Sequence, residues 1–426
     1  MKDIITKIIN KGFFHIFGAS VINKVVQFCS SIFLVRFVTQ ESFGAYVYSQ
    51  NILNIVMILT GLGSLAAALQ YGSETDEIRK KNAYFDIALK IGLPFNLFLC
   101  LVIGIWSQKY YNVESNLNVL LLMIAMPFFI YVFDYYQNYL RTNYKNKEFS
   151  RVSSINTVGI FFLSIFGAIF FDILGVILGM YLAYAVSIGY SYYICREIKR
   201  ENSYTLKKTE KKEFIKYAIN SLLNNGIAQT IYLLDIFLLG LLLKDPILLA
   251  TYKTATLIPF ALRFIPVSIM TFIYPYVAKN RKNNNWILNN YKKITISLFS
   301  FNLFLFIILE IFAPLIFKIM FGSEYVEGIM YFRILMIGFL IDSTLRVPAG
   351  NILAMMQKVK QLIFINAFCG VINLVLDIIL IEKYSALGAA YTNVIVIGIS
   401  SMFYTGYLLT TLKKNATTKE KASISN

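Results

Sequence analysis

Long apolar segments separated by short polar breaks dominate this sequence. A helix that crosses a bilayer needs about 20 mostly apolar residues, and twelve stretches meet that requirement. They occupy residues 12–38, 44–71, 83–108, 117–140, 151–171, 174–195, 214–243, 250–278, 291–320, 328–356, 362–381 and 385–412. Backbone exposed to lipid must satisfy its own hydrogen bonds, which favours helices. The pattern therefore predicts an all-α membrane protein with twelve transmembrane helices.

Composition excludes a soluble or catalytic alternative. The 426 residues are 57% hydrophobic and only 15% charged, so the polar side chains are too few to cover such a chain in water. The four cysteines lie singly in apolar stretches and there is one histidine, so we expect no metal site and no cofactor. A Walker motif is absent, and no polar segment is long enough for a soluble catalytic domain. We therefore expect a protein that is not an enzyme.

The distribution of basic residues orients the twelve segments. Lysine and arginine number 40 against 23 acidic residues, giving a net charge of +17. With an even number of spans, the loops on the side of both termini hold 29 of these basic residues, and the opposite loops hold four. The positive-inside rule assigns the basic side, and thus both termini, to the cytoplasm. Attraction to anionic lipid accounts for the charge, and we expect no nucleic-acid partner.

The longest polar stretch divides the segments into two sets of six. Short sequences recur between the sets: Ser154-Ile155-Asn156 corresponds to Phe364-Ile365-Asn366, and chance similarity between apolar helices is the alternative explanation. Repeats of six spans keep their orientation, which predicts two six-helix bundles related by pseudo-two-fold symmetry along the membrane normal. The predicted regions are an N-terminal lobe (1–195), a cytoplasmic linker (196–213), a C-terminal lobe (214–412) and a disordered cytoplasmic tail (413–426).

Polar residues follow single faces of several apolar segments. In the membrane a charge costs several kcal/mol unless it faces a cavity or a partner, so these stripes indicate a water-filled passage between the lobes. Lys24 and Arg263 lie near the middle of their segments, so the passage is predicted to be cationic and to favour a multiply negative ligand such as a pyrophosphate. The predicted substrate-binding residues are Lys24, Arg263, Arg36, Lys253, Arg346, Gln27, Asn51 and Tyr252.

Two aspartates lie among these basic residues. Asp342 is four residues from Arg346, a spacing at which the two side chains pair on a helix, and Asp235 is a candidate for ion coupling or for a hydrogen bond to a neighbouring tyrosine. Alternative interpretations stay open: Arg36 and Lys253 lie close enough to an interface to snorkel, and Asp342 with Arg346 is also consistent with a purely structural pair.

Several short motifs resemble a known family. The first segment runs from Gly18-Ala19-Ser20 to Val35-Arg36-Phe37 and is followed by Gln40-Glu41-Ser42-Phe43-Gly44-Ala45-Tyr46. Asp235-Ile236-Phe237-Leu238-Leu239-Gly240 with Ala250-Thr251-Tyr252 echoes that opening, and Tyr274-Pro275 resembles the proline that ends the eighth span. These motifs resemble those of polysaccharide repeat-unit flippases (the O-antigen, or Wzx, type) of the multidrug/oligosaccharidyl-lipid/polysaccharide exporter superfamily. Ala250-Thr251 stands where the echo usually shows glycine.

The resemblance implies a function. It implies a secondary transporter that moves undecaprenyl-pyrophosphate-linked oligosaccharide across the bacterial inner membrane by alternating access, for O-antigen or capsule assembly. It also implies a proton or sodium ion as coupling ion, and a glycan polymerase and a chain-length regulator as protein partners. Two alternatives stay open: a multidrug cation antiporter of the same superfamily, and a non-transporting membrane scaffold for glycan assembly.

Overall fold

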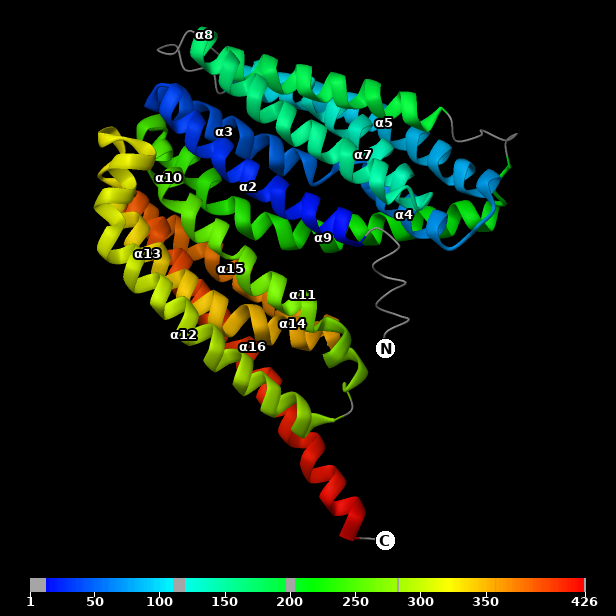
Figure 1. Ribbon diagram of the computed structural model, residues 1–426, viewed down its shortest axis with the longest axis vertical. Coiled ribbons are helices and arrows are strands. Elements are labelled where there is room, and N and C mark those ends of the chain that lie inside the picture. The colour runs from blue at the N-terminus through cyan, green and yellow to red at the C-terminus, as the bar shows by residue number, and fades with distance from the viewer. Residues whose placement is uncertain (1–12, 110–118, 197–203, 282, 357, 425–426) are drawn as a thin grey trace. The chain divides into compact units, whose positions relative to one another are not determined.

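Helices form almost all of the chain in the computed structural model, which describes residues 13–109, 119–196, 204–281, 283–356 and 358–424 (Figure 1). Among these residues, nine helices are long and apolar enough to cross a membrane. The predicted all-α membrane class is therefore confirmed, while the count of twelve spans stays a prediction.

The chain divides into two compact units, of which the first is Met1–Leu233. In this unit α8 packs along both α2 and α7, and α4 packs on α5. Buried aromatic side chains, among them Phe85, Tyr131 and Tyr139, form its core. Its elements are α2 (Phe13–Phe37), α3 (Gln40–Met57), η1 (Thr60–Gly63), α4 (Ser64–Ser73), α5 (Ile78–Lys109), α6 (Val119–Leu122), α7 (Met126–Thr142), α8 (Asn146–Cys195) and the first part of α9 (Lys208–Leu243).

The second predicted span is a broken helix. Between α3 and α4, Gly61, Leu62 and Gly63 have φ values of 53°, 51° and 74°, in the left-handed region. Gly63 is required both for its positive φ and for lack of space, because a Cβ atom at this position would lie 2.2 Å from the backbone oxygen of Ala218. The break therefore lets α4 approach α9 closely.

The fifth and sixth predicted spans are joined in the single element α8, which bends sharply at its middle. Phe171 and Asp172 have non-helical backbone angles there, and the Asp172 carboxylate accepts a hydrogen bond from Ser42 Oγ at 2.6 Å. The two halves of α8 pack tightly against each other beside the bend. A Cβ atom added to Gly167 would lie 2.1 Å from the backbone oxygen of Gly175, and one added to Gly175 would lie 2.0 Å from that of Gly167.

The second unit is Leu234–Asn426. Here α16 packs on α13 and α15, and α13 also contacts α10 and α12. Its elements are the end of α9, α10 (Pro246–Leu262), α11 (Phe264–Lys279), α12 (Asn284–Ile316), the π-helical η2 (Phe317–Phe321), η3 (Ser323–Tyr325), α13 (Gly328–Ile341), the π-helical η4 (Asp342–Arg346), α14 (Val347–Met355), α15 (Val359–Tyr384) and α16 (Ala386–Ile424).

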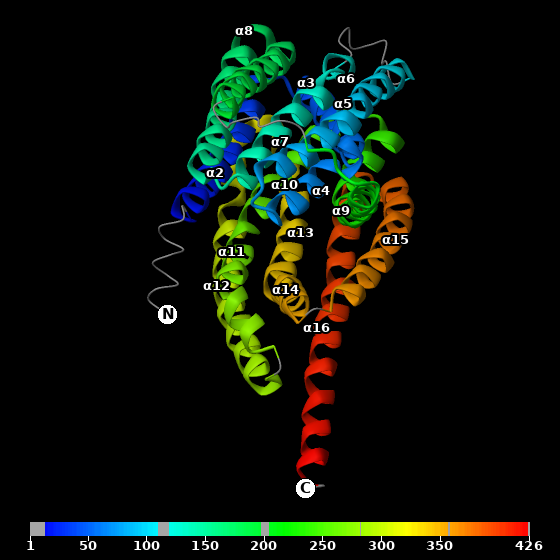
Figure 2. The same ribbon diagram turned by 90° about the vertical axis from the view of Figure 1, so that its right-hand side faces the viewer.

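At the chain end, a helix continues into the segment predicted to be a disordered cytoplasmic tail (413–426). The helix α16 continues to Ile424 and extends beyond the other helices of its unit (Figure 2), while residues 425–426 lie outside the described part. Lysine, glutamate and alanine are good helix formers, and they recur in the stretch Lys413–Ile424 without a proline. Local propensity therefore favours continuation of the helix.

Candidate functional site

A helix interruption places Arg263 at the centre of the candidate site. The α10 helix ends at Leu262 and α11 begins at Phe264, so Arg263 is the residue between them. Pro266 follows three residues later and has no N–H to bond the carbonyl of Leu262, which weakens the helix at this point. The amide of Val267 donates a 3.4 Å hydrogen bond to the carbonyl of Arg263, which connects the end of α10 to α11.

A π-helical turn presents the two other charged residues. In η4 the amide of Val347 bonds the carbonyl of Asp342, five residues back, instead of four. Pro348 cannot donate to the carbonyl of Thr344, which accounts for the wider turn. Such π-helical bulges are frequent at functional sites. The turn carries Asp342 and Arg346 on one side.

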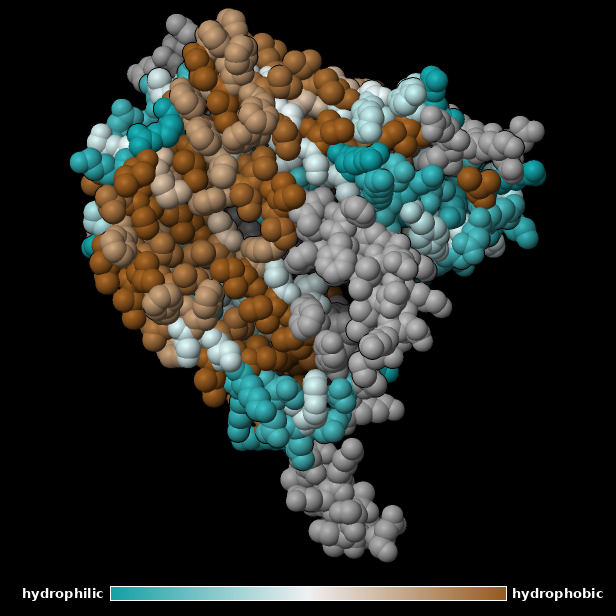
Figure 3. All heavy atoms as spheres, in the orientation of Figure 1, coloured by the Kyte–Doolittle hydropathy of each residue, from teal (hydrophilic) through white to brown (hydrophobic). Residues whose placement is uncertain are grey.

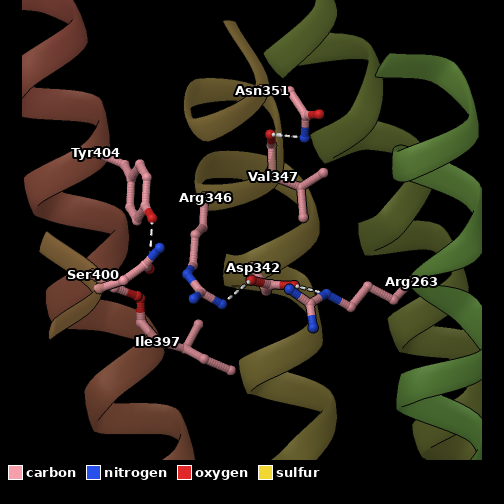
Figure 4. A network of polar contacts seen from close by, with 9 residues as sticks. Arg263, Asp342, Arg346, Val347, Asn351, Ile397, Ser400 and Tyr404 are labelled. Carbon is pink, nitrogen blue, oxygen red and sulfur yellow. Dashed lines mark hydrogen bonds and ion pairs between the residues drawn. The ribbon is translucent and has the colours of Figure 1, made fainter. Parts of the chain in front are cut away.

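Asp342 is held between two arginines. Its Oδ2 lies 2.7 Å from Arg263 Nε and its Oδ1 lies 3.1 Å from Arg346 Nη1. The Asp342 side chain is 5% exposed, against 27% for Arg263 and 15% for Arg346. Figure 4 shows Arg263 reaching Asp342 from one side and Arg346 from the other. These three residues, which we call the arginine cluster, together carry one positive charge.

Neighbouring side chains hold Arg346 in position. Its guanidinium carbon lies 5.9 Å from the centre of the Tyr404 ring, a cation–π distance. Tyr404 in turn donates a 2.7 Å hydrogen bond to Asn366 Oδ1. This chain of contacts joins η4 to α16 and α15, so the cluster is supported by three elements of the second unit (Figure 4).

A second polar group of the same unit surrounds Asp235. Its carboxylate accepts hydrogen bonds from Asn393 at 3.2 Å, from Asn373 at 3.4 Å and from Tyr252 at 3.4 Å. These donors lie on α16, α15 and α10 respectively. Asp235 is 8% exposed and Tyr252 is 1% exposed, so the end of α9 is tied to three helices through one carboxylate.

Asp377 adds a second carboxylate beside Asp235. It interacts with Asp235 and with Thr392 and is fully buried. Both oxygens of Asp377, Oδ1 of Asn373 and Oγ1 of Thr392 are buried, and within the described part of the chain none of them has a hydrogen bond of good geometry. Buried charge needs a compensating partner, and carboxylate, amide and hydroxyl oxygens are the ligands of hard cations. This acidic cluster is therefore suited to hold a proton or a metal cation.

Five of the predicted site residues of the second unit thus fall into two groups. Arg263, Asp342 and Arg346 form the arginine cluster, and the i,i+4 spacing correctly indicates the contact within η4. Asp235 and Tyr252 are hydrogen-bonded to each other in the acidic cluster. Their roles in substrate binding and ion coupling stay predictions.

The other predicted site residues lie on α2, α3 and α10. Lys24 is exposed on α2 and donates to Gln27 at 3.4 Å, and Arg36 is exposed in the last turn of the same helix. Asn51 is buried and donates to a backbone carbonyl of α9 at 3.2 Å. Lys253 lies half-buried on α10. The contacts of Asn51 are typical of helix packing.

Sequence reasoning missed four of the six residues of the acidic cluster. Asn373 and Asp377 are four residues apart in an apolar span, the same spacing that singled out the other polar stripes. The signal was therefore present in the eleventh segment, but its partners Thr392 and Asn393 lie on another helix and share no sequence pattern with it. Only the packing of α15 on α16 brings them together.

Comparisons with known proteins agree on family and fold. The model of the polysaccharide biosynthesis protein family matches residues 9–281, and a search of curated proteins finds no match. The lipid II flippase MurJ in an inward closed conformation aligns with a TM-score of 0.73 at 16% identity, over 93% of this chain and 87% of that one. An inward-facing multidrug resistance MATE transporter of the MOP superfamily aligns with a TM-score of 0.75 at 12% identity, over 93% and 96%.

A third solved structure also aligns over nearly the whole chain. A MOP superfamily transporter from Pyrococcus furiosus, described as having a binding pocket of reverse polarity, aligns with a TM-score of 0.58 at 12% identity, covering 96% of each chain. The chain thus has the fold of these multi-pass transporters, as its sequence motifs predict.

Proposed function

Since the chain belongs to the polysaccharide biosynthesis protein family, we propose that it flips an undecaprenyl-pyrophosphate-linked oligosaccharide across the bacterial inner membrane by alternating access. The product would enter O-antigen or capsule assembly. The observation that carries this proposal is the arginine cluster, in which a single buried carboxylate faces two guanidinium groups within an apolar helical unit.

The charge of the cluster favours an anionic ligand. A buried ion pair is stable only when its geometry satisfies both charges, and here Asp342 offsets one of two arginines. Guanidinium groups bind phosphate oxygens through paired, charge-assisted hydrogen bonds. A pyrophosphate supplies several such oxygens, so it can exchange with Asp342 as the partner of Arg263 while the sugar and the lipid chain remain outside the cluster.

A flipping assay in proteoliposomes that contain a fluorescent lipid-linked oligosaccharide tests the proposal. We expect Arg263→Ala and Arg346→Ala each to lower the rate roughly tenfold or more, the value of one lost charge-assisted hydrogen bond. Arg333→Ala is the matched control, because Arg333 pairs with Glu310 at 3.4 Å on an exposed surface of the same unit. Wild-type flipping by Arg263→Ala protein of unchanged abundance would refute the role of the cluster.

We assign the coupling ion to the acidic cluster. Asp377 lies beside Asp235, and its two buried oxygens accept no hydrogen bond of good geometry within the described chain. A proton or a sodium ion bound there would stabilise the two carboxyl groups, and its release would leave the site uncompensated. Flipping that is driven by an imposed sodium gradient identifies sodium as the coupling ion, and flipping that is driven by a pH gradient alone identifies the proton. In either case Asp377→Asn should reduce the gradient-driven rate. A gradient-independent rate in both the wild type and Asp377→Asn would exclude this assignment.

A second candidate function is favoured by the same acidic cluster. Asp235 and Asp377 are also consistent with a multidrug cation antiporter, in which a carboxylate receives the cationic drug. Ethidium efflux from cells separates the two functions, because only the antiporter gives efflux that depends on Asp235. If the protein exports ethidium and its loss leaves glycan export unchanged, the antiporter function would replace the flippase proposal.

A further inference from the structure

A groove lies between α11 and α12 on the surface of the second unit. It has a volume of about 430 Å³, within the range of small-molecule pockets. Ile265 and Ile269 line it from α11, and Phe301 and Ser297 line it from α12. Its walls are thus almost entirely apolar, and it is separate from the arginine and acidic clusters.

One charged residue marks an end of this groove. Lys293 is its only charged lining residue and lies on α12 eight residues before Phe301. Eight residues of helix span about 12 Å, which compares with about 15 Å for half of the hydrocarbon core. The groove therefore extends from Lys293 at one end to the apolar side chain of Phe301 at the other, and its length is close to the thickness of one leaflet.

The surroundings of the groove face the bilayer. In the most apolar 18-residue stretch of the span that contains α12, only 11% is buried inside the structure. This is the lowest value among the nine candidate spans of the described chain. In Figure 3 the surface along α12 is hydrophobic and turns hydrophilic at the end where α12 begins. The positive-inside rule assigns that basic end to the cytoplasm.

We infer that this groove binds an anionic phospholipid of the cytoplasmic leaflet, with the phosphate at Lys293 and an acyl chain along Ile269 and Ile265 toward Phe301. The orientation of the groove matches such a lipid, whose headgroup lies at the cytoplasmic surface and whose chain points to the midplane. A lysine near an anionic headgroup contributes to binding, while the apolar walls receive the chain. This inference is independent of the transported substrate.

Tryptophan fluorescence in vesicles tests the inference. Phe301→Trp is introduced after Trp106→Phe and Trp286→Phe have removed the two native tryptophans. Phosphatidylglycerol with brominated chains should quench the introduced tryptophan more than brominated phosphatidylcholine at equal mole fraction, by about the fivefold preference that one lysine gives at an anionic surface. Phe304→Trp, on an exposed part of α12 outside the groove, should show no such preference.

Adjacent lysines provide the matched control. Lys293→Ala should abolish the preference for phosphatidylglycerol, whereas Lys292→Ala, which removes a neighbouring exposed lysine outside the groove, should keep it. Equal quenching by both lipids, or equal loss in both alanine variants, would overturn the inference. Stronger relief of quenching by unlabelled polyprenyl phosphate than by unlabelled phosphatidylglycerol would assign the groove to the carrier lipid instead. Native mass spectrometry of the unsubstituted protein with each phospholipid gives a second measurement that needs no tryptophan variant.

Discussion

The Nε atom of Arg263 lies 2.7 Å from Oδ2 of Asp342, and this ion pair joins the α10–α11 junction to the π-helical turn of η4. Both partners lie where a proline disturbs regular helix geometry, Pro266 near one and Pro348 near the other. Irregular backbone at membrane depth is tolerated where it is buried or lines a water-filled cavity. The pair is therefore the point at which sequence irregularity and buried charge coincide.

Replacing the shared carboxylate should be the most damaging change in the arginine cluster. Asp342→Asn leaves two guanidinium groups without their common counter-charge, and we expect a loss of about 3–5 kcal/mol in unfolding free energy. Arg263→Ala leaves Asp342 paired with Arg346 and should cost less, about 1–3 kcal/mol. Thermal unfolding of the purified variants in detergent measures the order. The reverse order would show that Arg346 alone does not satisfy Asp342.

Removing the second carboxyl group of the acidic cluster should stabilise the protein in sodium-free buffer. Asp377→Asn replaces one of two adjacent buried carboxyl groups by a neutral amide and removes the repulsion between them, so we expect a gain of about 1–3 kcal/mol. Added sodium should raise the melting temperature of the wild type and leave that of the variant unchanged. A wild type that is insensitive to sodium and as stable as the variant would contradict this expectation.

The left-handed break before α4 should not tolerate a side chain. Gly63→Ala places a Cβ atom 2.2 Å from the Ala218 oxygen at a φ of +74°, so we expect a loss of at least about 1–3 kcal/mol. Gly398→Ala is the matched control, because nothing in the described structure lies within 4 Å of a Cβ atom at that helical position. That variant should be neutral or more stable by up to about 1 kcal/mol. Differential scanning fluorimetry of both variants provides the comparison.

The beginning of α9 should lose its attachment to α5 in acid. Lys80 Nζ lies 2.6 Å from Glu210 Oε1, and this hydrogen bond, with that from the Lys207 amide, holds the pKa of Glu210 below its ordinary value. The folded state thus favours the carboxylate, so its stabilisation is present above the unfolded pKa of about 4.3 and is lost as the pH falls below that value.

Glu210→Gln should consequently lower the melting temperature at neutral pH, by an amount that corresponds to about 1 kcal/mol or less for a surface pair. The difference from the wild type should disappear in acid. Glu213→Gln, an exposed glutamate one turn later in the same helix, should leave the melting temperature unchanged at both pH values. A Glu210→Gln effect that persists in acid would indicate a packing role instead of a charge role.

Much of the fold was predictable because the bilayer limits the alternatives. Apolar length and short polar breaks are local properties, and in lipid they permit only helices, so the membrane class follows from the sequence. Interruptions within spans were harder to predict. Pro266 and Pro348 mark two of them, but the break at Gly61–Gly63 also depends on the close approach of Ala218, which lies far away in sequence.

The sequence by itself determined the helical membrane class and the placement of charged residues within spans, because both depend on hydropathy and spacing along one helix. It also predicted the contact between Asp342 and Arg346, since residues four apart share a helix face. Only the tertiary structure decided that Arg263 shares the Asp342 carboxylate and that Asp377 lies beside Asp235. Those contacts join helices separated by long stretches of sequence, and helix periodicity carries no information about which helices pack together.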